Sequence, residues 1–395
     1  MNGREAVDSG ELRRQVLAAM LEDIHQQGEV VSAEALRIQE QIDEIIAECE
    51  PRDIERIHLV GCGDSLYAAM AARLAVAEWS GKWVEPVESL EFRYCVGGLS
   101  DASLVVGISV SGQVQRTLDS LEMARERGAF TVGITGTPNS KIHTCAERVI
   151  DIGVRGREPG PVPGTASYVA NLATLYWLGL AFGIDAKHIS ADEADAHRRS
   201  VLDALGQIRA VAERNEASVR RYVDDHTAPE PLVLIGGGPN WATAHFGVAK
   251  LLEAALVLGV VQELEEWVHE QYFLTGPDLH TILIGADGAI ADRLSATANA
   301  VVTLGAPLAL VLPEGIDLGV EAAAVWRYPS GIPELLSPIV ASIPLELLAY
   351  SLAVDLERHP FDYDNPTRRL ISERTIYQNG ESAQTIGRRH QPEAE

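Results

Sequence analysis

Two serine-bearing loops carry the clearest chemistry in the sequence. Residues 107–113 read Gly-Ile-Ser-Val-Ser-Gly-Gln, between an apolar strand-like run and a helical one. Backbone N–H groups and the dipole at a helix start favour an anion. Ser109 and Ser111 add hydroxyl donors, and Gly112 lets the backbone approach a ligand closely. The loop predicts a phosphate site, although an ordinary helix cap has the same pattern.

A second loop of this kind lies earlier in the chain. Residues 61–65 read Gly-Cys-Gly-Asp-Ser and again follow an apolar strand-like run. In an open parallel sheet, ligands bind beyond the carboxyl ends of the strands. Ser65 is therefore expected to join the serines of the first loop in one phosphate pocket, with Gly63 and Asp64 as further candidates for its lining.

A lysine and a glutamate at helical spacing form the second chemical candidate. Lys250 and Glu253 stand at i and i+3 in an otherwise largely apolar helical segment, so both point to nearly one side. They form either an exposed ion pair, which contributes little, or a pair held in a cleft. Downstream, residues 263–270 form a dense acidic run around His269, a pattern that more often marks a solvated segment than a site.

The elements that must position these residues alternate between strands and helices. Apolar strand-like runs begin at residues 56, 82, 104, 130 and 148, with helical stretches between them. This rhythm predicts a doubly wound parallel sheet with helices on both faces. After a Pro-containing break at 227–231 the pattern restarts, and the Gly-rich turns of the two units are about 175 residues apart.

We therefore predict an α/β fold of two tandem flavodoxin-like units, with a helical arm before them and a tail after them. A single long helix is expected over 333–356. The expected boundaries are a helical arm at 1–50, a phosphate-binding unit at 51–188, a helical connector at 189–228, a second unit carrying the base at 229–357, and a tail at 358–395.

The composition limits the ligands. The 395 residues carry a net charge of −25, and the sequence pI is about 4.8. Nucleic acids and anionic membrane surfaces are therefore poor partners, whereas one phosphate needs only a few aimed donors. Four scattered cysteines, a polar start to the chain and the shortness of the longest apolar stretches lead us to expect a soluble, cytoplasmic protein.

The order of these pieces resembles the SIS (sugar isomerase) family. In particular it resembles the double-SIS isomerase half of glucosamine-6-phosphate synthase and stand-alone phosphosugar isomerases, deaminases and deglycases. The family's Gly-Cys-Gly-Thr-Ser and Ser-Gln-Ser-Gly-Glu-Thr loops match residues 61–65 and 109–114. The resemblance implies a phosphate-binding role for both loops. Val110 and Val114 replace two side-chain donors of the family pattern.

The second unit carries the family's Gly-x-x-Lys-Leu-x-Glu helix at 247–253. By resemblance, Glu253 is the base that moves a proton between C1 and C2 of the sugar. Lys250 is expected either to hold Glu253 in place or to offset the negative charge that develops in the reaction. The family has a ring-opening histidine sixteen residues after the glutamate, often reaching into the neighbouring subunit's site. His269 stands at that spacing.

Two further segments resemble the family in part. Residues 362–370 match its tail, but Ser372 stands where the synthase has a lysine that contacts the open-chain sugar. Thr165 and Ser167 lie in a segment where the family has Val-Ala-Ser-Thr-Lys, and both are candidates for the pocket lining; Thr165 also fits a helix cap. Residues 1–51 are too short for a glutaminase domain, so a complete synthase is not expected.

These observations lead to the hypothesis of an aldose–ketose isomerase acting on a sugar or amino-sugar phosphate. Removal of an amine from C1 or C2, as in a deaminase or deglycase, uses the same proton shuttle and remains the alternative. A non-catalytic phosphosugar sensor is a third possibility, which the Glu253–His269 spacing disfavours. We expect no metal or organic cofactor and, by resemblance, a homodimer with sites shared between subunits.

Overall fold

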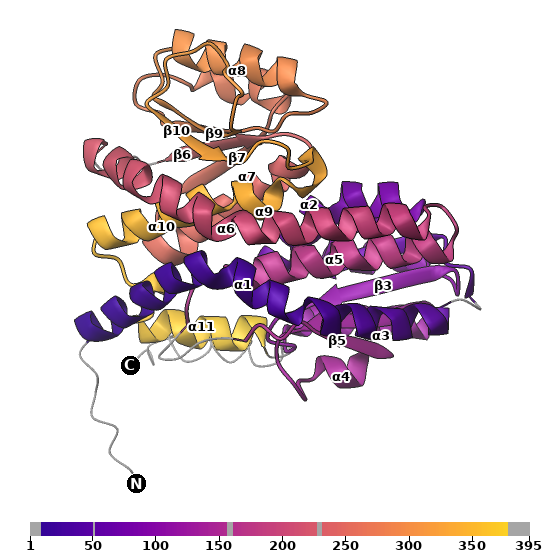
Figure 1. The fold of residues 1–395 in the computed structure, drawn as a ribbon. Coiled ribbons are helices and arrows are strands. Elements are labelled where there is room, and N and C mark those ends of the chain that lie inside the picture. The colour runs from indigo at the N-terminus through magenta and orange to yellow at the C-terminus, as the bar shows by residue number, and fades with distance from the viewer. Residues whose placement is uncertain (1–8, 50–51, 156–160, 227–230, 378–395) are drawn as a thin grey trace, which may run out of the picture.

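The chain folds into two five-stranded parallel sheets joined by long helices (Figure 1). The structure, a computed structural model, describes residues 9–49, 52–155, 161–226 and 231–377. The sheet orders are β2-β1-β3-β4-β5 and β10-β9-β8-β6-β7, which are the same winding in each unit. The tandem α/β fold predicted from the alternating pattern is confirmed.

The first unit begins after helix α1 (Ser9–Cys49), which is one continuous helix of 41 residues. Its strands and helices alternate along the chain as the pattern predicted. The strands are β1 (Arg56–Gly61), β2 (Trp83–Glu88), β3 (Ser103–Ile108), β4 (Phe130–Thr135) and β5 (Arg148–Asp151), and the helices are α2 (Asp64–Ser80), α3 (Gln115–Glu126), α4 (Ile142–Cys145) and α5 (Ala166–Asp185), with 3-10 turns at Glu91–Tyr94 and Val96–Gly98.

The second unit follows helix α6 (Ala191–Asp225). It repeats the winding of the first. The strands are β6 (Leu232–Gly236), β7 (Gly259–Glu263), β8 (Thr281–Ile284), β9 (Leu308–Pro313) and β10 (Ala324–Tyr328). The helices are α7 (Pro239–Lys250), a π-helical turn at Leu251–Ala255, α8 (Ala291–Thr303), α9 (Pro338–Ala341), α10 (Ile343–Asp355) and α11 (Pro366–Ile376). Short 3-10 turns lie at Glu266–Val268, Gln271–Phe273, Glu334–Leu336 and Pro360–Asp362.

The two units share an unusual backbone turn, which supports an internal duplication. Gly63 has φ 55° and ψ −130°, and Gly238 has φ 56° and ψ −132°. Each lies directly before the helix that follows the first strand of its unit, and they are 175 residues apart. A side chain at positive φ is strained, so glycine is favoured at both positions.

One shared core holds the two units together. The largest hydrophobic cluster combines one face of the first sheet, the buried residues of α1, α5 and α6, and the inner residues of α7 and α10. Two smaller clusters fill the outer faces, under α3 and α4 in the first unit and under α8 in the second. The helices between the sheets are therefore buried on most sides, which fixes the units relative to each other.

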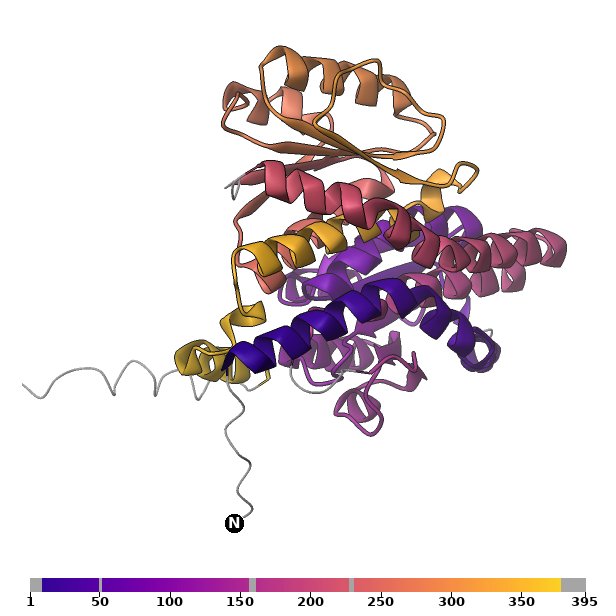
Figure 2. The same ribbon diagram turned by 60° about the vertical axis from the view of Figure 1, so that its left-hand side comes forward.

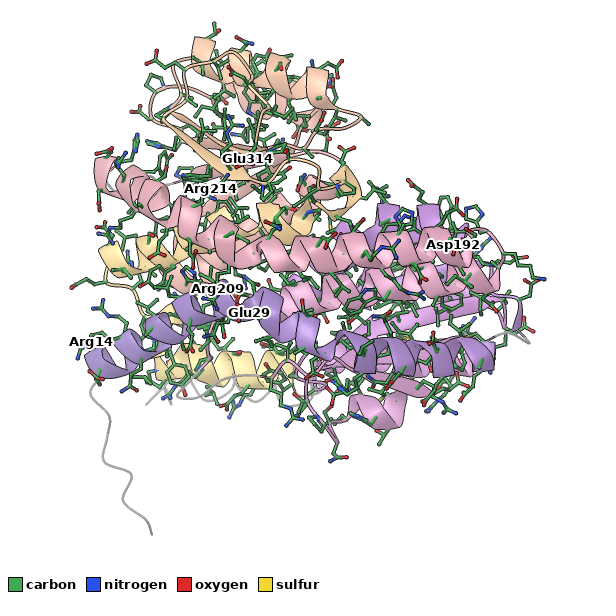
Figure 3. The ribbon with its side chains drawn as sticks, viewed as in Figure 1. Arg14, Glu29, Asp192, Arg209, Arg214 and Glu314 are labelled. Carbon is green, nitrogen blue, oxygen red and sulfur yellow. The ribbon has the colours of Figure 1, made fainter. Side chains whose placement is uncertain are left out.

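Helix α6 packs against both units rather than serving as a bare connector. It starts with a capping box in which Ser190 and Glu193 exchange side-chain and backbone hydrogen bonds. Figure 2 shows it running between α1 and the second unit. Two surface ion pairs labelled in Figure 3 extend from it: Arg209 contacts Glu29 of α1 at 2.8 Å, and Arg214 contacts Glu314 after β9.

Two local predictions differ from the structure. The helix expected over 333–356 is divided into a 3-10 turn, α9 and α10. Pro338 and Pro344 occupy first-turn positions of α9 and α10, where their missing N–H groups are tolerated and a new helix start is favoured. Strand β7 at 259–263 was not anticipated, because its short run ends in polar residues and borders the acidic segment.

The length of the longest apolar segments was also underestimated from the sequence. Helix α5 and the segment Pro338–Asp355 are long and apolar enough to cross a membrane by length and composition. However, 89% and 83% of their apolar windows are buried inside the protein. Core helices that are covered on all sides are apolar all round for the same reason, so these two helices are explained by the shared core.

Candidate functional site

The two serine loops lie side by side at the carboxyl edge of the first sheet. Gly61 and Ile108 are register partners at the ends of β1 and β3, so the chain leaves both strands at the same place. A cavity of about 730 Å³ opens there. Its lining includes Gly63, Asp64, Ser65, Ser109, Val110, Ser111, Val114, Thr165, Ser167 and Glu253.

The loop before α3 presents hydroxyls and backbone donors to this cavity. Ser109 is buried, and its Oγ lies 3.5 Å from the Val114 amide nitrogen. The Gln113 N–H donates to Ser111 Oγ at 3.3 Å. Helix α3 has no side-chain cap at Val114, so the free N–H groups of its first turn remain for a ligand.

Gly112 does not line the cavity but shapes the loop. Its φ is 61°, in the left-handed region, and a Cβ there would overlap the hydroxyl of Ser140. The carbonyl of Val110 accepts the hydroxyls of Thr135 and Thr137, at 3.1 and 3.0 Å. These contacts hold the loop in one shape before a ligand arrives.

Thr165 occupies the N-cap position of α5 without acting as a side-chain cap. Its hydroxyl forms no cap hydrogen bond, and the oxygen is buried with no partner among the described residues. The helix-cap interpretation is therefore wrong for the side chain. A buried hydroxyl next to the cavity has an unused donor and acceptor, and a ligand can satisfy both.

Lys250 and Glu253 form a buried pair, not an exposed one. Lys250 is fully buried, and its Nζ donates to Glu253 Oε2 and, at 2.6 Å, to Asp64 Oδ2. Glu253 keeps 29% of its side-chain surface exposed and lines the cavity. One ammonium thus lies between two carboxylates, one from each unit.

The environment makes Glu253 basic. Burial raises the pKa of Glu253 to about 7, and the Asp64 carboxylate adds to this while Lys250 opposes it. For Lys250, burial alone lowers the pKa, but the charges of Asp64 and Glu253 outweigh burial and raise it. The lysine stays protonated, and the glutamate can exchange a proton near neutral pH.

The backbone next to Glu253 explains its position. Helix α7 ends at Lys250, and residues Leu251–Ala255 form a π-helical turn. Leu256 then ends the turn with φ 55°. Such π-turns widen a helix locally and occur often at functional sites, and here the turn carries the carboxylate at the cavity.

Two predicted residues lie elsewhere. His269 is not among the described residues that line the cavity; 64% of its side chain is exposed, and its Nε2 is 3.4 Å from Glu265. Ser372 lies on an exposed part of α11 and is likewise absent from the described lining, whereas Thr375, Ile376 and Tyr377 at the end of that helix contribute to it.

Several cavity residues were missed from the sequence. Arg116 and Arg155 line the cavity, and Arg116 also contacts Asp119 at 2.7 Å. Asp23 of α1 lines it too. Arg116 lies within three residues of the serine loop and could have been found by that proximity, whereas Arg155 and Asp23 carry no signal in the sequence.

The corresponding loops of the second unit both bind the segment at residues 334–337 instead. Asn240, which lies 175 residues after Ser65, donates to Ser337 Oγ at 2.9 Å. In the loop that follows β8, the Ala289 N–H donates to the carboxylate of Glu334 at 3.1 Å. A carboxylate already occupies this loop, which supports the expectation that the second unit does not hold the phosphate.

The comparisons with known proteins agree with this arrangement. The family model for the SIS domain matches residues 52–181. Glutamine–fructose-6-phosphate aminotransferase (isomerizing) of Gloeobacter violaceus is 29% identical over 333 residues, covering 82% of this chain and 52% of that protein. The chain spans about half the length of such curated relatives.

Solved structures show the same fold. The C-terminal domain of glucosamine-fructose-6-phosphate aminotransferase from Francisella tularensis has a TM-score of 0.75 at 20% identity, covering 86% of this chain and 96% of that one. Tagatose-6-phosphate ketose/aldose isomerase from Escherichia coli has a TM-score of 0.70 at 13% identity, covering 86% and 93%.

Residues 52–181, which make up most of the first unit, therefore match the SIS-domain family. The chain resembles the isomerase half of the glucosamine-forming aminotransferases and stand-alone phosphosugar isomerases and deaminases. Within the described residues, no group of three or more His, Cys, Asp or Glu side chains is placed to hold a metal ion.

Proposed function

We propose that this protein is a phosphosugar isomerase that interconverts aldose and ketose phosphates by a 1,2-proton shuttle. The proposal rests on the observation that phosphate-type donors and a candidate base line the same cavity. Hydroxyl and amide donors of the first unit line one part of it, and the basic carboxylate of Glu253 from the second unit lines another.

The proposed reaction needs one base that acts on two neighbouring carbons. In the open-chain aldose, the Glu253 carboxylate takes the proton from C2, and the electrons of that C–H bond form the enediolate. The same carboxyl group then returns a proton to C1 while the proton of the C2 hydroxyl is transferred to O1, so that C2 becomes the carbonyl of the ketose. A carboxylate with a pKa near the working pH suits both halves of this exchange.

The serine loops bind the far end of the substrate. A phosphate at Ser65, Ser109 and Ser111 orients the reacting carbons toward Glu253, so binding energy remote from the reaction is used for positioning. Lys250 is buried behind the carboxylate and holds it in place. Arg116 and Arg155 add positive charge to a cavity that otherwise contains carboxylates.

We further propose that the protein acts as a homodimer in which His269 serves the partner's cavity. The resemblance gives this histidine a ring-opening role, yet in its own chain it points to solvent rather than lining the site. Phe273 and Leu274 close by are 71% and 76% exposed. Exposed apolar side chains next to a functional residue favour a protein interface.

We propose a cytoplasmic location as well. Cys49, Cys62, Cys95 and Cys145 all carry free thiols, which is the usual state in a reducing compartment and supports this proposal.

Hydrogen exchange tests the proposed chemistry directly. Candidate aldose and ketose phosphates are incubated with the protein in deuterium oxide, and deuterium at C1 and C2 is followed by NMR. Wild type should incorporate deuterium and interconvert the pair, and Glu253→Gln should lose both activities. Glu78→Gln, an exposed glutamate on α2, is the matched control. Absence of exchange by wild type on every candidate contradicts the proposal, and release of ammonia or a free amino acid assigns the shuttle to amine removal instead.

Mixing two inactive variants tests the shared site. If Glu253 and His269 of different chains form one site, a dimer of one Glu253→Gln chain and one His269→Asn chain contains one intact site. Random exchange of subunits then restores about a quarter of wild-type activity. No recovery, in a mixture shown to contain mixed dimers, contradicts the shared site.

A further inference from the structure

Asp64 makes a contact that joins the phosphate loop to the catalytic base. Its Oδ2 accepts from Lys250 Nζ at 2.6 Å, although the two residues are 186 positions apart and belong to different units. Lys250 donates at the same time to Glu253. The ammonium has no exposed surface, so both carboxylates interact with it in a medium that screens charges weakly.

We propose that Asp64 is a positioning residue for Glu253, holding Lys250 between two carboxylates so that Glu253 remains basic enough to move a substrate proton. The proposal rests on the proton-shuttle function proposed above for Glu253. In the family motif that this loop resembles, the corresponding residue is a threonine, which has no charge to share the lysine. Asp64 is therefore a feature of this chain.

The turn is built so that Asp64 reaches the lysine. Gly63 with φ 55° directs the chain into α2, and Asp64 is the first residue of that helix. A Cβ on Gly164 would come within 3.3 Å of Asp64 Oδ2, so the neighbouring loop packs closely over the carboxylate. The other oxygen, Oδ1, is buried and has no hydrogen-bond partner among the described residues.

An ammonium shared by two carboxylates differs from a simple ion pair. With Glu253 alone, Lys250 would stabilise the ionised glutamate fully and make it a weak base. With Asp64 beside the same ammonium, the cluster has two acidic side chains for one positive charge, which favours a proton on Glu253. Glu253, which lines the cavity and touches the substrate in the proposed reaction, is placed to exchange that proton.

Other ionisable groups around the cluster come from every element packed against it. Tyr67 lies on α2, and burial raises the pKa of its phenol, with Asp64 and Glu253 adding to this effect. The remaining groups are Tyr168 of α5, Glu346 of α10, and Asp23 and Arg155 at the cavity wall. The side-chain hydrogen bonds of Lys250 within the described residues go to Asp64 and Glu253.

The direction of the effect follows from the charges. Removing the negative charge of Asp64 takes away a neighbour that raises the pKa of Glu253 and leaves Lys250 to interact with Glu253 alone. Both changes lower the pKa of Glu253. The base is then ionised at lower pH but accepts a proton less readily, so its activity should extend to more acidic pH and reach a lower maximum.

The test compares Asp64→Asn and Asp64→Thr with wild type. In the deuterium-exchange assay, the acid limb of the pH profile should move down by about one pH unit, and the plateau rate should fall at least several-fold. Asn preserves the shape of Asp, and Thr restores the family residue, so two variants guard against a folding defect. Asp287→Asn, an exposed carboxylate in the loop after β8, is the control and should leave the profile unchanged.

A second readout does not require turnover. Protein labelled with ¹³C at the glutamate carboxyl is titrated by NMR, and the Glu253 signal is assigned by its loss in Glu253→Gln. Its midpoint should fall in Asp64→Asn and in Asp64→Thr. Unchanged midpoints overturn the positioning role of Asp64 even if the enzyme is active. Shifted midpoints without exchange in wild type support the role of Asp64 and contradict the proposed function instead.

Discussion

A buried acid between the first helix and the second unit should make the protein more stable in mild acid. Glu346 of α10 is fully buried, and Gln27 of α1 donates to its Oε2 at 2.6 Å. Glu346 Oε1 and Gln27 Oε1 have no partner among the described residues. Burial raises the pKa of Glu346 to about 8, with Gln27 and Lys250 opposing this. At neutral pH the folded protein therefore keeps the proton on Glu346.

The size of the effect follows from proton linkage. Between its ordinary pKa of 4.5 and about 8, Glu346 binds a proton in the folded chain but not in the unfolded one. The free energy of unfolding therefore falls as pH rises through this window, by about 1.4 kcal/mol per pH unit. Over the whole window the free energy of unfolding falls by on the order of 5 kcal/mol. The Glu346→Gln variant should lack this pH-dependent loss.

Urea unfolding followed by circular dichroism, at pH values from 5 to 8.5, measures this effect. The Gln variant keeps the shape and a neutral group, so its midpoint should vary less with pH and exceed that of wild type above pH 8. Glu253 also has a raised pKa and adds a pH dependence of stability with the same sign. The quantity to compare is therefore the difference in urea midpoint between Glu346→Gln and wild type at each pH. Glu78→Gln should follow wild type. Parallel curves for Glu346→Gln and wild type would refute the reasoning.

Three further perturbations follow from the site. Gly112→Ala should destabilise the protein by about 1 kcal/mol more than Gly128→Ala, because both glycines have positive φ but of the two only Gly112 lacks room for a Cβ. Equal urea midpoints for the two variants would contradict this expectation. Lys250→Met should reduce stability by about 3 kcal/mol at pH 8 and by less at pH 5.5, where the Glu253 carboxyl can take up a proton. A loss of stability independent of pH would contradict the buried pairing. Ser109→Ala with Ser111→Ala should weaken binding of a sugar phosphate at least tenfold, measured by calorimetry, and leave the dephosphorylated sugar unaffected, whereas equal losses would remove the phosphate assignment.

Much of the site could be predicted from the sequence, because its residues lie close together along the chain in short motifs. The serine loops follow strands directly, and parallel strands end at one edge, so their meeting was predictable. The i, i+3 spacing placed Lys250 and Glu253 on one side of a helix. The hydroxyl of Thr165 was misjudged, because a cap position does not decide where a side-chain oxygen points.

Contacts between segments that are distant along the chain could not be predicted from the sequence. Nothing in the sequence near Asp64 indicates that it meets Lys250, and nothing near Gln27 indicates that it meets Glu346. Both contacts arise where helices from different parts of the chain pack into one core. Arg155 reaches the cavity for the same reason, from the segment that follows β5, an edge strand of the first sheet.

The sequence by itself determined the two units, their winding, and the placement of the serine loops in the first unit and of Lys250 and Glu253 in the second, since strand periodicity, glycine turns and residue spacing act within a few residues. The tertiary structure decided which charges share a buried environment. Burial and proximity set the basicity of Glu253 and Glu346, and both depend on helices brought together from separate units. One cavity of an acidic protein therefore combines the serine loops of one unit with the basic carboxylate of Glu253 from the other.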